Sequence, residues 1–279
     1  MADALRRFLD EDLGQGDLTS QAVVRGESAK AVVFPREACV LAGGEEAAAV
    51  FAHLGLKVAR PVADGDRVPP RATVLAIEGD AAAILSGERV ALNLLMRLSG
   101  IATATRLVVE RCRTTNPKIE VAATRKTTPG LRELEKKAVV LGGGHPHRMR
   151  LDDAILVKEN HIEVAGSVEE AVRRVRERFP DRPFQVEARS REEALAAVSA
   201  GARALLLDNF DPTALAAVAK EIRARHPDVF LEASGGVDPD EAQRYARHVD
   251  RVSLGRLTHS VTAIDFALDL ADVRRAPRP

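Results

Sequence analysis

Two neighbouring stretches of this chain have the same layout. The first is Ala122-Ala123-Thr124-Arg125-Lys126-Thr127-Thr128-Pro129-Gly130, and the second is Ile155-Leu156-Val157-Lys158-Glu159-Asn160-His161. Each is a short apolar run that ends in cations. Residues 122–161 contain eight Arg or Lys against five Asp or Glu, whereas the whole chain has 41 of each sign. Basic side chains at strand ends and glycine turns indicate a pocket for a ligand with several negative charges.

The alternation of strand-like and helix-like segments continues after Pro117. Apolar runs fall at 119–123, 154–157, 184–186, 204–207, 229–231 and 251–254, and helical patterns at 131–141, 168–179, 191–200, 212–225 and 238–246. Strands that alternate with helices in this way predict a parallel sheet with helical crossovers.

Polar residues or glycines follow each apolar run. They are Arg125 and Lys126, Lys158 and Glu159, Glu187, Asp208 and Asn209, the segment 232–236, and Gly255. Active sites built from many successive strand ends are typical of an α/β barrel, whereas an open doubly wound sheet has its site at one switch point. We therefore expect a barrel. Six runs are visible where eight are standard, so either two strands are hidden or the barrel is incomplete.

The first part of the chain lacks this regularity. Short strands and helices alternate irregularly before a long apolar helix that begins near Ala81, which the pair Ser99-Gly100 is expected to break or kink. We expect a small α+β domain over 1–112 and the barrel over 113–265. A C-terminal segment, 266–279, is expected to pack back on the N-terminal domain.

Composition excludes several classes of function. The chain has no Trp and one Tyr, so it offers few stacking platforms for nucleic acid, and its net charge is zero. The two cysteines are too few for a disulfide framework. We read no membrane span and no signal peptide in the sequence. These features predict a cytoplasmic protein without nucleic-acid or membrane partners.

Late glycines and two carboxylates are candidates for phosphate and metal binding. Segments 234–236 and 254–260 look like phosphate-binding loops, since backbone N–H groups and helix N-termini hold phosphate in barrels, although ordinary turns have similar sequences. Glu187 and Asp208 end consecutive strands. They either neutralise neighbouring cations or hold Mg²⁺ together with phosphate oxygens.

The remaining motifs leave further alternatives open. Arg125, Arg148 and Lys158 are either surface charges or clamps for carboxylates. Lys158 is also a candidate Schiff-base lysine of an aldolase-type barrel. The triple glycine at 142–144 is not followed by Lys-Ser/Thr, so it is not a P-loop. His147 and His161 lack the spacing of a zinc site with a third ligand.

Several motifs, in this order, resemble the quinolinate phosphoribosyltransferase family. They are Glu88-Arg89-Val90-Ala91-Leu92-Asn93, Thr124-Arg125-Lys126-Thr127-Thr128-Pro129-Gly130-Leu131-Arg132, Gly143-Gly144 with His147-Arg148, Leu156-Val157-Lys158-Glu159-Asn160-His161, Glu232-Ala233-Ser234-Gly235-Gly236 and Leu257-Thr258-His259-Ser260. The likeness runs from Glu11 to Ser260, nearly the whole chain. It implies an N-terminal α+β sandwich joined to an incomplete α/β barrel of six or seven strands.

The resemblance also implies a reaction and a set of site residues. Quinolinate and phosphoribosyl pyrophosphate would give nicotinate mononucleotide, pyrophosphate and CO₂, with Mg²⁺ as cofactor and a homo-oligomer, dimer or hexamer, that shares its active sites. Lys126, Lys158, Glu187 and Asp208 would be catalytic, and Glu187 and Asp208 would hold the metal. The substrate-binding set would be Arg89 (from another subunit), Arg125, Lys126, His147, Arg148, Lys158, Glu187, Asp208, Ser234, Gly235, Gly255 and His259.

Three other functions remain as alternatives. One is a relative of the same fold that acts on another substrate, such as the homologues associated with molybdenum transport. The second is the Schiff-base aldolase that uses Lys158. The third is an anion-binding module without catalytic activity.

Overall fold

The computed structural model describes residues 2–275. The chain divides into two compact units, and each is described by itself. Unit 1 comprises Met1–Ala104 with Val261–Pro279, and unit 2 comprises Thr105–Ser260. The sequence placed these boundaries at 112 and 265. In the structure the first boundary, between Ala104 and Thr105, falls inside a single helix, α4 (Ala81–Arg113).

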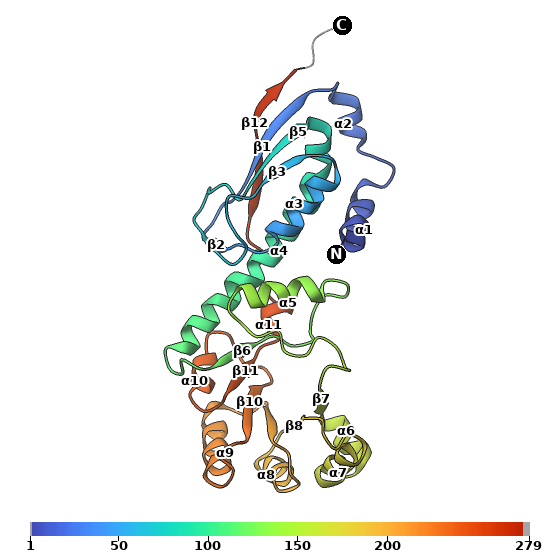
Figure 1. Cartoon of the computed structure of the whole chain (residues 1–279). Coiled ribbons are helices and arrows are strands. Elements are labelled where there is room, and N and C mark those ends of the chain that lie inside the picture. Colours follow the sequence, from blue (N-terminus) through green and yellow to red (C-terminus); the bar gives the residue numbers. More distant parts are fainter. Residues whose placement is uncertain (1, 276–279) are drawn as a thin grey trace. The chain divides into compact units, whose positions relative to one another are not determined.

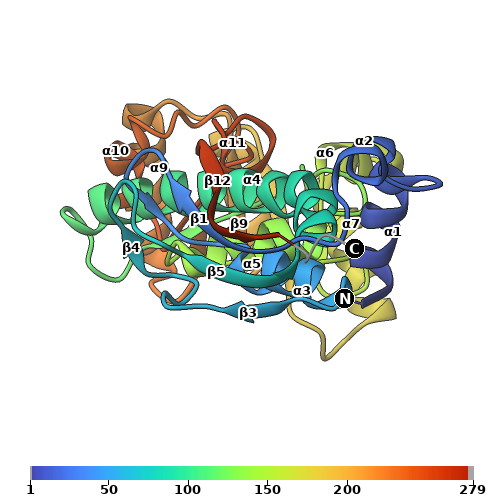
Figure 2. The ribbon, with the colours of Figure 1, turned by 90° about the horizontal axis from the view of Figure 1, so that it is seen from above.

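Unit 1 is built on an antiparallel sheet with the strand order β12-β1-β5-β3, which runs side by side in Figure 2. Its strands are β1 (Ser28–Pro35), β3 (Lys57–Ala59), β5 (Leu75–Asp80) and β12 (Phe266–Arg274), and β2 (Cys39–Val40) pairs separately with β4 (Arg67–Val68). Helices α1 (Ala2–Leu13), α2 (Leu18–Val23) and α3 (Gly44–His53) complete the unit with the first part of α4.

The C-terminal strand closes one side of this sheet. The antiparallel pairing of β12 with β1 extends from Phe266 opposite Pro35 to Arg274 opposite Ser28. The last described strand of the chain therefore belongs to the N-terminal unit.

Helix α4 is continuous through Ser99 and Gly100, so the predicted break there is wrong. Both residues serve packing inside unit 1 instead. The Ser99 hydroxyl donates to the carbonyl oxygen of Ala42 at 3.1 Å. A Cβ on Gly100 would lie 2.3 Å from the carbonyl oxygen of Thr262, so only glycine allows this close approach.

Helix α4 is also the one helix among residues 2–275 that is long and apolar enough to cross a membrane. Within its most apolar 18-residue window, 61% is buried inside the structure. This burial is typical of a core helix, which passes the same test of length and composition.

Unit 2 confirms the predicted parallel sheet, with all six strands at the expected places. They are β6 (Glu120–Ala122), β7 (Ile155–Val157), β8 (Phe184–Ala188), β9 (Ala204–Asp208), β10 (Phe230–Ser234) and β11 (Arg251–Ser253), in the order β6-β11-β10-β9-β8-β7. His145 adds an isolated parallel bridge to Ala122 beside β6. Within the described chain, no pairing joins β6 to β7, and the barrel is therefore incomplete.

The helices of unit 2 follow its strands, as Figure 1 shows. They are α5 (Arg132–Leu141), α6 (Glu159–Ala165), α7 (Val168–Arg178), α8 (Arg191–Ser199), α9 (Pro212–Arg225), α10 (Ala242–Ala246) and α11 (Arg256–His259). Of these, α6 and α11 were not predicted; each begins within three residues of a strand end. Ser167, Ser190 and Asp211 cap α7, α8 and α9 by accepting backbone N–H groups.

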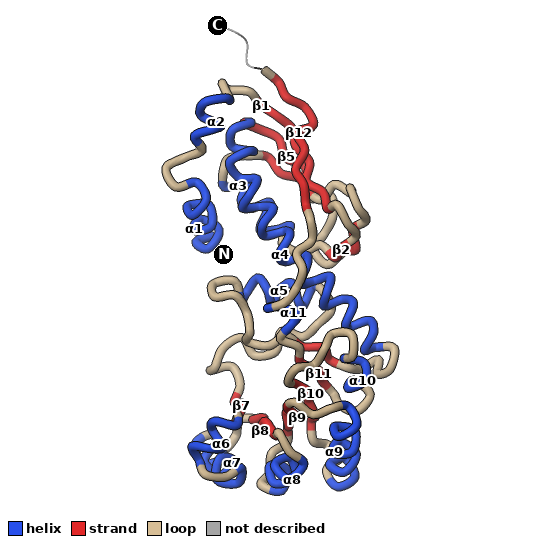
Figure 3. Tube along the Cα trace, turned by 180° about the vertical axis from the view of Figure 1, so that it is seen from behind, coloured by secondary structure: helices blue, strands red, loops and turns tan. Residues whose placement is uncertain are grey.

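The two faces of the sheet differ in chemistry. Residues such as Val186, Leu205 and Leu231 point to one side and form a buried apolar core with the helices, which lie along the outer side of the sheet in Figure 3. Their neighbours along the strands, among them Leu206 and Glu232, line a cavity on the other side. Successive side chains of a strand alternate between faces, so one sheet supports both the core and the cavity.

Candidate active site

A cavity of about 350 Å³ lies at the C-terminal ends of the parallel strands of unit 2. Its lining consists of Ala123, Thr124, Arg125, Lys126, His147, Arg148, Leu156, Lys158, Leu206, Asp208, Glu232, Ser234, Gly235 and Ser253. This position is the one in which α/β barrels build their active sites.

Eight of the twelve predicted site residues line this cavity: Arg125, Lys126, His147, Arg148, Lys158, Asp208, Ser234 and Gly235. Glu187 does not line it but forms an ion pair with the Nζ of Lys158. Gly255 lies close to both His259 and Lys126, since a Cβ on Gly255 would be 2.9 Å from the Nε2 of His259 and 3.0 Å from the Cδ of Lys126. Arg89 belongs to unit 1, where its side chain is exposed and pairs with Glu88.

One side of the cavity is strongly cationic. Burial and the neighbouring Arg125 lower the pKa of Arg148. The Nε of Arg125 is buried and has no hydrogen-bond partner. A buried donor without an acceptor is costly, so this part of the cavity is suited to an anionic ligand that would supply one.

Two carboxylates, Glu187 and Asp208, lie on the neighbouring strands β8 and β9. Burial and repulsion from Glu187 raise the pKa of Asp208. Asp208 also accepts a hydrogen bond from the side-chain amide of Asn209 at 2.5 Å. No group of three or more His, Cys, Asp or Glu side chains gathers to hold a metal within residues 2–275. Two close carboxylates nevertheless fit Mg²⁺, which commonly takes one or two protein carboxylates and completes its shell with phosphate oxygens and water.

The loop after β10 requires glycine. Gly235 has a φ of 81° and approaches the backbone so closely that a Cβ would lie 2.5 Å from the backbone N of Asn209. The N–H of Asn209 donates to the carbonyl oxygen of Ser234 at 3.0 Å, which fastens this loop to the end of β9. Thr258 of α11 donates to the carbonyl oxygen of Lys126 at 2.7 Å. The two candidate phosphate loops are thus tied to β9 and to the loop after β6.

A buried carboxylate, Glu232, lies beneath these side chains and was not assigned a role from the sequence. It is fully buried on β10 and accepts hydrogen bonds from Ser253, from Gln185 at 3.1 Å and from Arg251 at 3.3 Å. Burial alone would raise its pKa, but the hydrogen bonds from His147, Ser253 and Gln185 outweigh burial and hold the pKa at about 2.

Glu232 also orients His147. The Nδ1 of His147 accepts the backbone N–H of Arg148 at 2.7 Å, so the proton of the neutral ring is on Nε2. The Nε2 lies 3.3 Å from the Oε1 of Glu232. The carboxylate therefore fixes both the tautomer and the direction of the ring.

The alternation of side chains along the strands could have identified the cavity-lining residues that were not predicted. Leu156, Leu206, Glu232 and Ser253 each lie two residues before a residue that was predicted for the site (Lys158, Asp208, Ser234 and Gly255). Side chains two apart on a strand share a face. The residue two positions before each predicted site residue can thus be expected to line the cavity as well.

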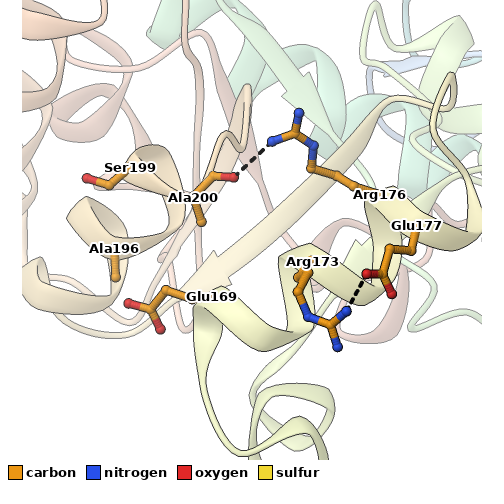
Figure 4. Close-up of a pocket in the computed structure, with 7 residues that line it drawn as sticks. All are labelled: Glu169, Arg173, Arg176, Glu177, Ala196, Ser199 and Ala200. Carbon is orange, nitrogen blue, oxygen red and sulfur yellow. Dashed lines mark hydrogen bonds and ion pairs between the residues drawn. The ribbon is translucent and has the colours of Figure 1, made fainter.

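A larger cavity, about 570 Å³, lies between α7 and α8 on the outside of unit 2 (Figure 4). Two of its charged side chains have partners: Arg173 pairs with Glu177, and Arg176 donates to the carbonyl oxygen of Ala200 at 3.3 Å. It lies between helices, away from the strand ends. The smaller cavity is therefore the better candidate for an active site.

Comparison with protein families agrees with this geometry. The model described as "Quinolinate phosphoribosyl transferase, N-terminal domain" matches residues 17–99, and the one described as "Quinolinate phosphoribosyl transferase, C-terminal domain" matches residues 101–269. The chain belongs to the quinolinate phosphoribosyl transferase family. The resemblance that was seen in the motifs is thereby confirmed.

Curated members of the family are similar over nearly their whole length. The probable nicotinate-nucleotide pyrophosphorylase [carboxylating] of Methanothermobacter thermautotrophicus is 41% identical, over 98% of this chain and 100% of its own. The human nicotinate-nucleotide pyrophosphorylase [carboxylating] is 40% identical, over 94% of this chain and 89% of its own.

Solved structures of the family confirm the fold class. A nicotinate-nucleotide pyrophosphorylase from Ehrlichia chaffeensis superimposes with a TM-score of 0.92 at 31% identity, covering 97% of this chain and 98% of its own. A NadC deletion mutant in a cubic crystal form superimposes with a TM-score of 0.91 at 36% identity, covering 99% of this chain and 97% of its own. The family fold therefore extends across both units.

Proposed function

We propose that this chain transfers the phosphoribosyl group from phosphoribosyl pyrophosphate to quinolinate and releases pyrophosphate and CO₂, leaving nicotinate mononucleotide for NAD synthesis. One observation carries the proposal. The cavity of this family member has crowded cations, including a buried donor of Arg125 without an acceptor, together with the carboxylate of Asp208, which the nearby Glu187 repels.

The charge distribution suits two anionic substrates. Quinolinate is a dianion and phosphoribosyl pyrophosphate is more negative still, so bringing them together costs several kcal/mol without cations. We assign the carboxylates of quinolinate to Arg125, His147 and Arg148, with Lys126 and Lys158 between the two substrates. Ser234, Gly235, Gly255 and His259 would bind the 5′-phosphate.

The reaction needs electrostatic stabilisation more than acid–base chemistry. The ring nitrogen of quinolinate bonds to C1 of the ribose, and the electron pair of the broken C–O bond leaves with pyrophosphate. Lys126 and Lys158 would stabilise that leaving group. Mg²⁺, held by Glu187 and Asp208 with substrate oxygens, would supply further positive charge to it. Loss of CO₂ from C2 leaves an electron pair that the adjacent pyridinium nitrogen stabilises until C2 takes a proton.

A turnover assay tests the proposal. We expect the purified protein to form nicotinate mononucleotide and equimolar CO₂ from quinolinate and phosphoribosyl pyrophosphate. Activity should disappear with a chelator and return with added Mg²⁺. Nicotinate in place of quinolinate is the control. Turnover of nicotinate alone, or no CO₂ from quinolinate, would contradict the proposed substrate.

We further propose a cytoplasmic homo-oligomer, a dimer or a hexamer, in which Arg89 completes the site of another subunit. Arg89 is an exposed cation among the predicted site residues, and unit 2 alone does not contain it. Leu18 and Val23 on α2 are 79% and 71% exposed, which favours burial of this helix against a second copy. Cys39 and Cys112 are buried free thiols, as a reducing compartment allows.

Mixing two inactive variants tests the shared site. Arg89→Ala and Lys158→Ala chains should each be inactive as homo-oligomers. After equal amounts are denatured together and refolded, about a quarter of the shared sites would combine an intact Arg89 with an intact Lys158, so activity should return. Mixing without subunit exchange is the control. No recovery in a mixture shown by mass spectrometry to contain hybrid oligomers would contradict the assignment of Arg89.

A further inference from the structure

Helix α5 contacts both loops that present the cations of the cavity. Glu135 is fully buried and accepts the N–H of Thr128 at 3.1 Å and its hydroxyl at 2.8 Å, in the loop that follows Arg125 and Lys126. Arg132 donates to the Thr127 hydroxyl at 2.9 Å and to the Met149 carbonyl oxygen at 3.1 Å. One helix therefore connects the loop after β6 to the loop that contains His147 and Arg148.

The tightest of these connections is made by Lys136. Its side chain is 1% exposed, although lysine is almost never fully buried. The Nζ donates to the carbonyl oxygen of Pro146 at 2.6 Å and to that of Arg148 at 2.5 Å. Burying an ammonium group is unfavourable, and here burial lowers its pKa to about 8. An apolar side chain could be buried at this position at a lower cost in free energy. What Lys136 adds is therefore its two hydrogen bonds.

Of the two residues between those carbonyl groups, His147 and Arg148, the first is strained. His147 has a φ of 54°, in the left-handed region that residues with a Cβ seldom adopt. Strained backbone persists only where its surroundings hold it. Lys136 holds the peptide group before His147 and the one after Arg148, and the conformation of the turn between them decides where the His147 ring and the Arg148 guanidinium lie.

We propose that Lys136 is a positioning residue for the transfer reaction. By binding the carbonyl oxygens of Pro146 and Arg148, it keeps His147 in its left-handed turn and aims His147 and Arg148 into the cavity. It touches neither substrate. The inference rests on the proposed function for its kinetic consequence, whereas its structural consequence, the orientation of His147, is independent of that function.

The kinetic experiment compares Lys136→Met, which keeps the volume and removes the donors, with Lys136→Arg, which restores donors. Lys136→Met should lower kcat/KM for quinolinate about 100-fold, the loss expected for a misplacement of about 1 Å. The KM for phosphoribosyl pyrophosphate should stay within about twofold, because the glycine loops are not attached to Lys136. Lys136→Arg should recover part of the loss. Lys220→Met, the same change at an exposed position on α9, is the control and should behave as the wild type.

A second measurement does not need activity. The ¹⁵N spectrum of the imidazoles, with the His147 signal assigned from a His147→Gln variant, should show the Nε2–H tautomer in the wild type. In Lys136→Met that signal should move to the position of a mobile, averaged imidazole. An unchanged His147 signal, or quinolinate kinetics within threefold of the wild type in folded Lys136→Met, overturns the proposal. An inactive wild-type protein would overturn only the proposed function, and the spectrum would still decide the role of Lys136.

Discussion

Glu232 shows how one buried side chain organises the site above it. Its carboxylate receives hydrogen bonds from Ser253, Gln185 and Arg251 and faces the protonated nitrogen of His147. The ionised form is therefore better stabilised in the folded chain than in water. A carboxylate of this kind stabilises the fold only while it remains ionised.

The stability of the fold should consequently depend on Glu232 in acid. Its pKa is about 2 when folded, against 4.5 ordinarily. The unfolded chain thus binds the proton first, and the stabilisation is complete above about pH 4.5 and is lost as the pH falls towards 2. The free energy of unfolding of Glu232→Gln should be about 2–4 kcal/mol lower than that of the wild type at pH 7. Between pH 4.5 and 2 it should fall less steeply than in the wild type. Urea unfolding at pH 7 and between pH 4.5 and 2 measures the loss of stability and its dependence on pH. The same change at an exposed position, Glu133→Gln, is the control. Parallel pH profiles for wild type and Glu232→Gln would refute the assignment.

Lys158 should be needed for chemistry more than for folding. Its Nζ pairs with Glu187, and its side chain is 44% exposed at the cavity. Lys158→Ala should therefore lower kcat/KM by at least about 10²-fold, the usual loss for one electrostatic contact in a transition state, while the melting temperature changes little. Arg125→Ala should likewise lower kcat/KM and leave the melting temperature nearly unchanged. Turnover and circular dichroism are the measurements, and Arg189→Ala, at an exposed ion pair, is the control. Near wild-type kcat/KM in both variants would disprove the site assignment.

Among the elements of unit 2, the loop after β10 requires glycine for two reasons, its backbone conformation and its close approach to a neighbour. Gly235→Ala combines a positive φ with a Cβ 2.5 Å from the backbone of Asn209. It should destabilise the protein by more than the ~1–2 kcal/mol of left-handed strain alone and raise the KM for phosphoribosyl pyrophosphate. Gly166→Ala is the matched control, because Gly166 also has a positive φ but no atom within 4 Å of its would-be Cβ. Thermal unfolding and steady-state kinetics compare the two. Equal effects in both variants would show that the contact with Asn209 is unimportant.

The sheet of unit 2 was predictable because buried parallel strands are continuous apolar runs. Strand β12 was not predicted as a strand, since Asp269, Asp272 and Arg274 interrupt its apolar pattern at an exposed edge. The buried roles of Glu135 and Lys136 were also missed. Charged residues on a helix are normally read as facing solvent, and only the loops that fold over α5 bury these two. Contacts between distant segments leave no local pattern.

Within the whole molecule, the sheet of unit 1 depends on a strand from the far end of the chain. Phe266 on β12 is 2% exposed, whereas Val273 on the same strand is 52% exposed. Phe266→Ala should destabilise the protein by about 3–5 kcal/mol, and Val273→Ala by less than about 0.5 kcal/mol. Hydrogen exchange should localise the effect of Phe266→Ala to unit 1. Faster exchange throughout unit 2 as well would mean that the two units unfold together.

The return of β12 to β1 sets an order of events during synthesis. Unit 2 is one uninterrupted stretch, Thr105–Ser260, and all of it has been translated before residue 266 is added. Domains generally fold as units while the chain grows. The edge of β1 therefore stays uncovered while the ribosome makes the whole of unit 2, and an unpaired strand edge is a template for aggregation. We therefore expect protection of the nascent chain by a chaperone to matter most for β1, until β12 has been translated.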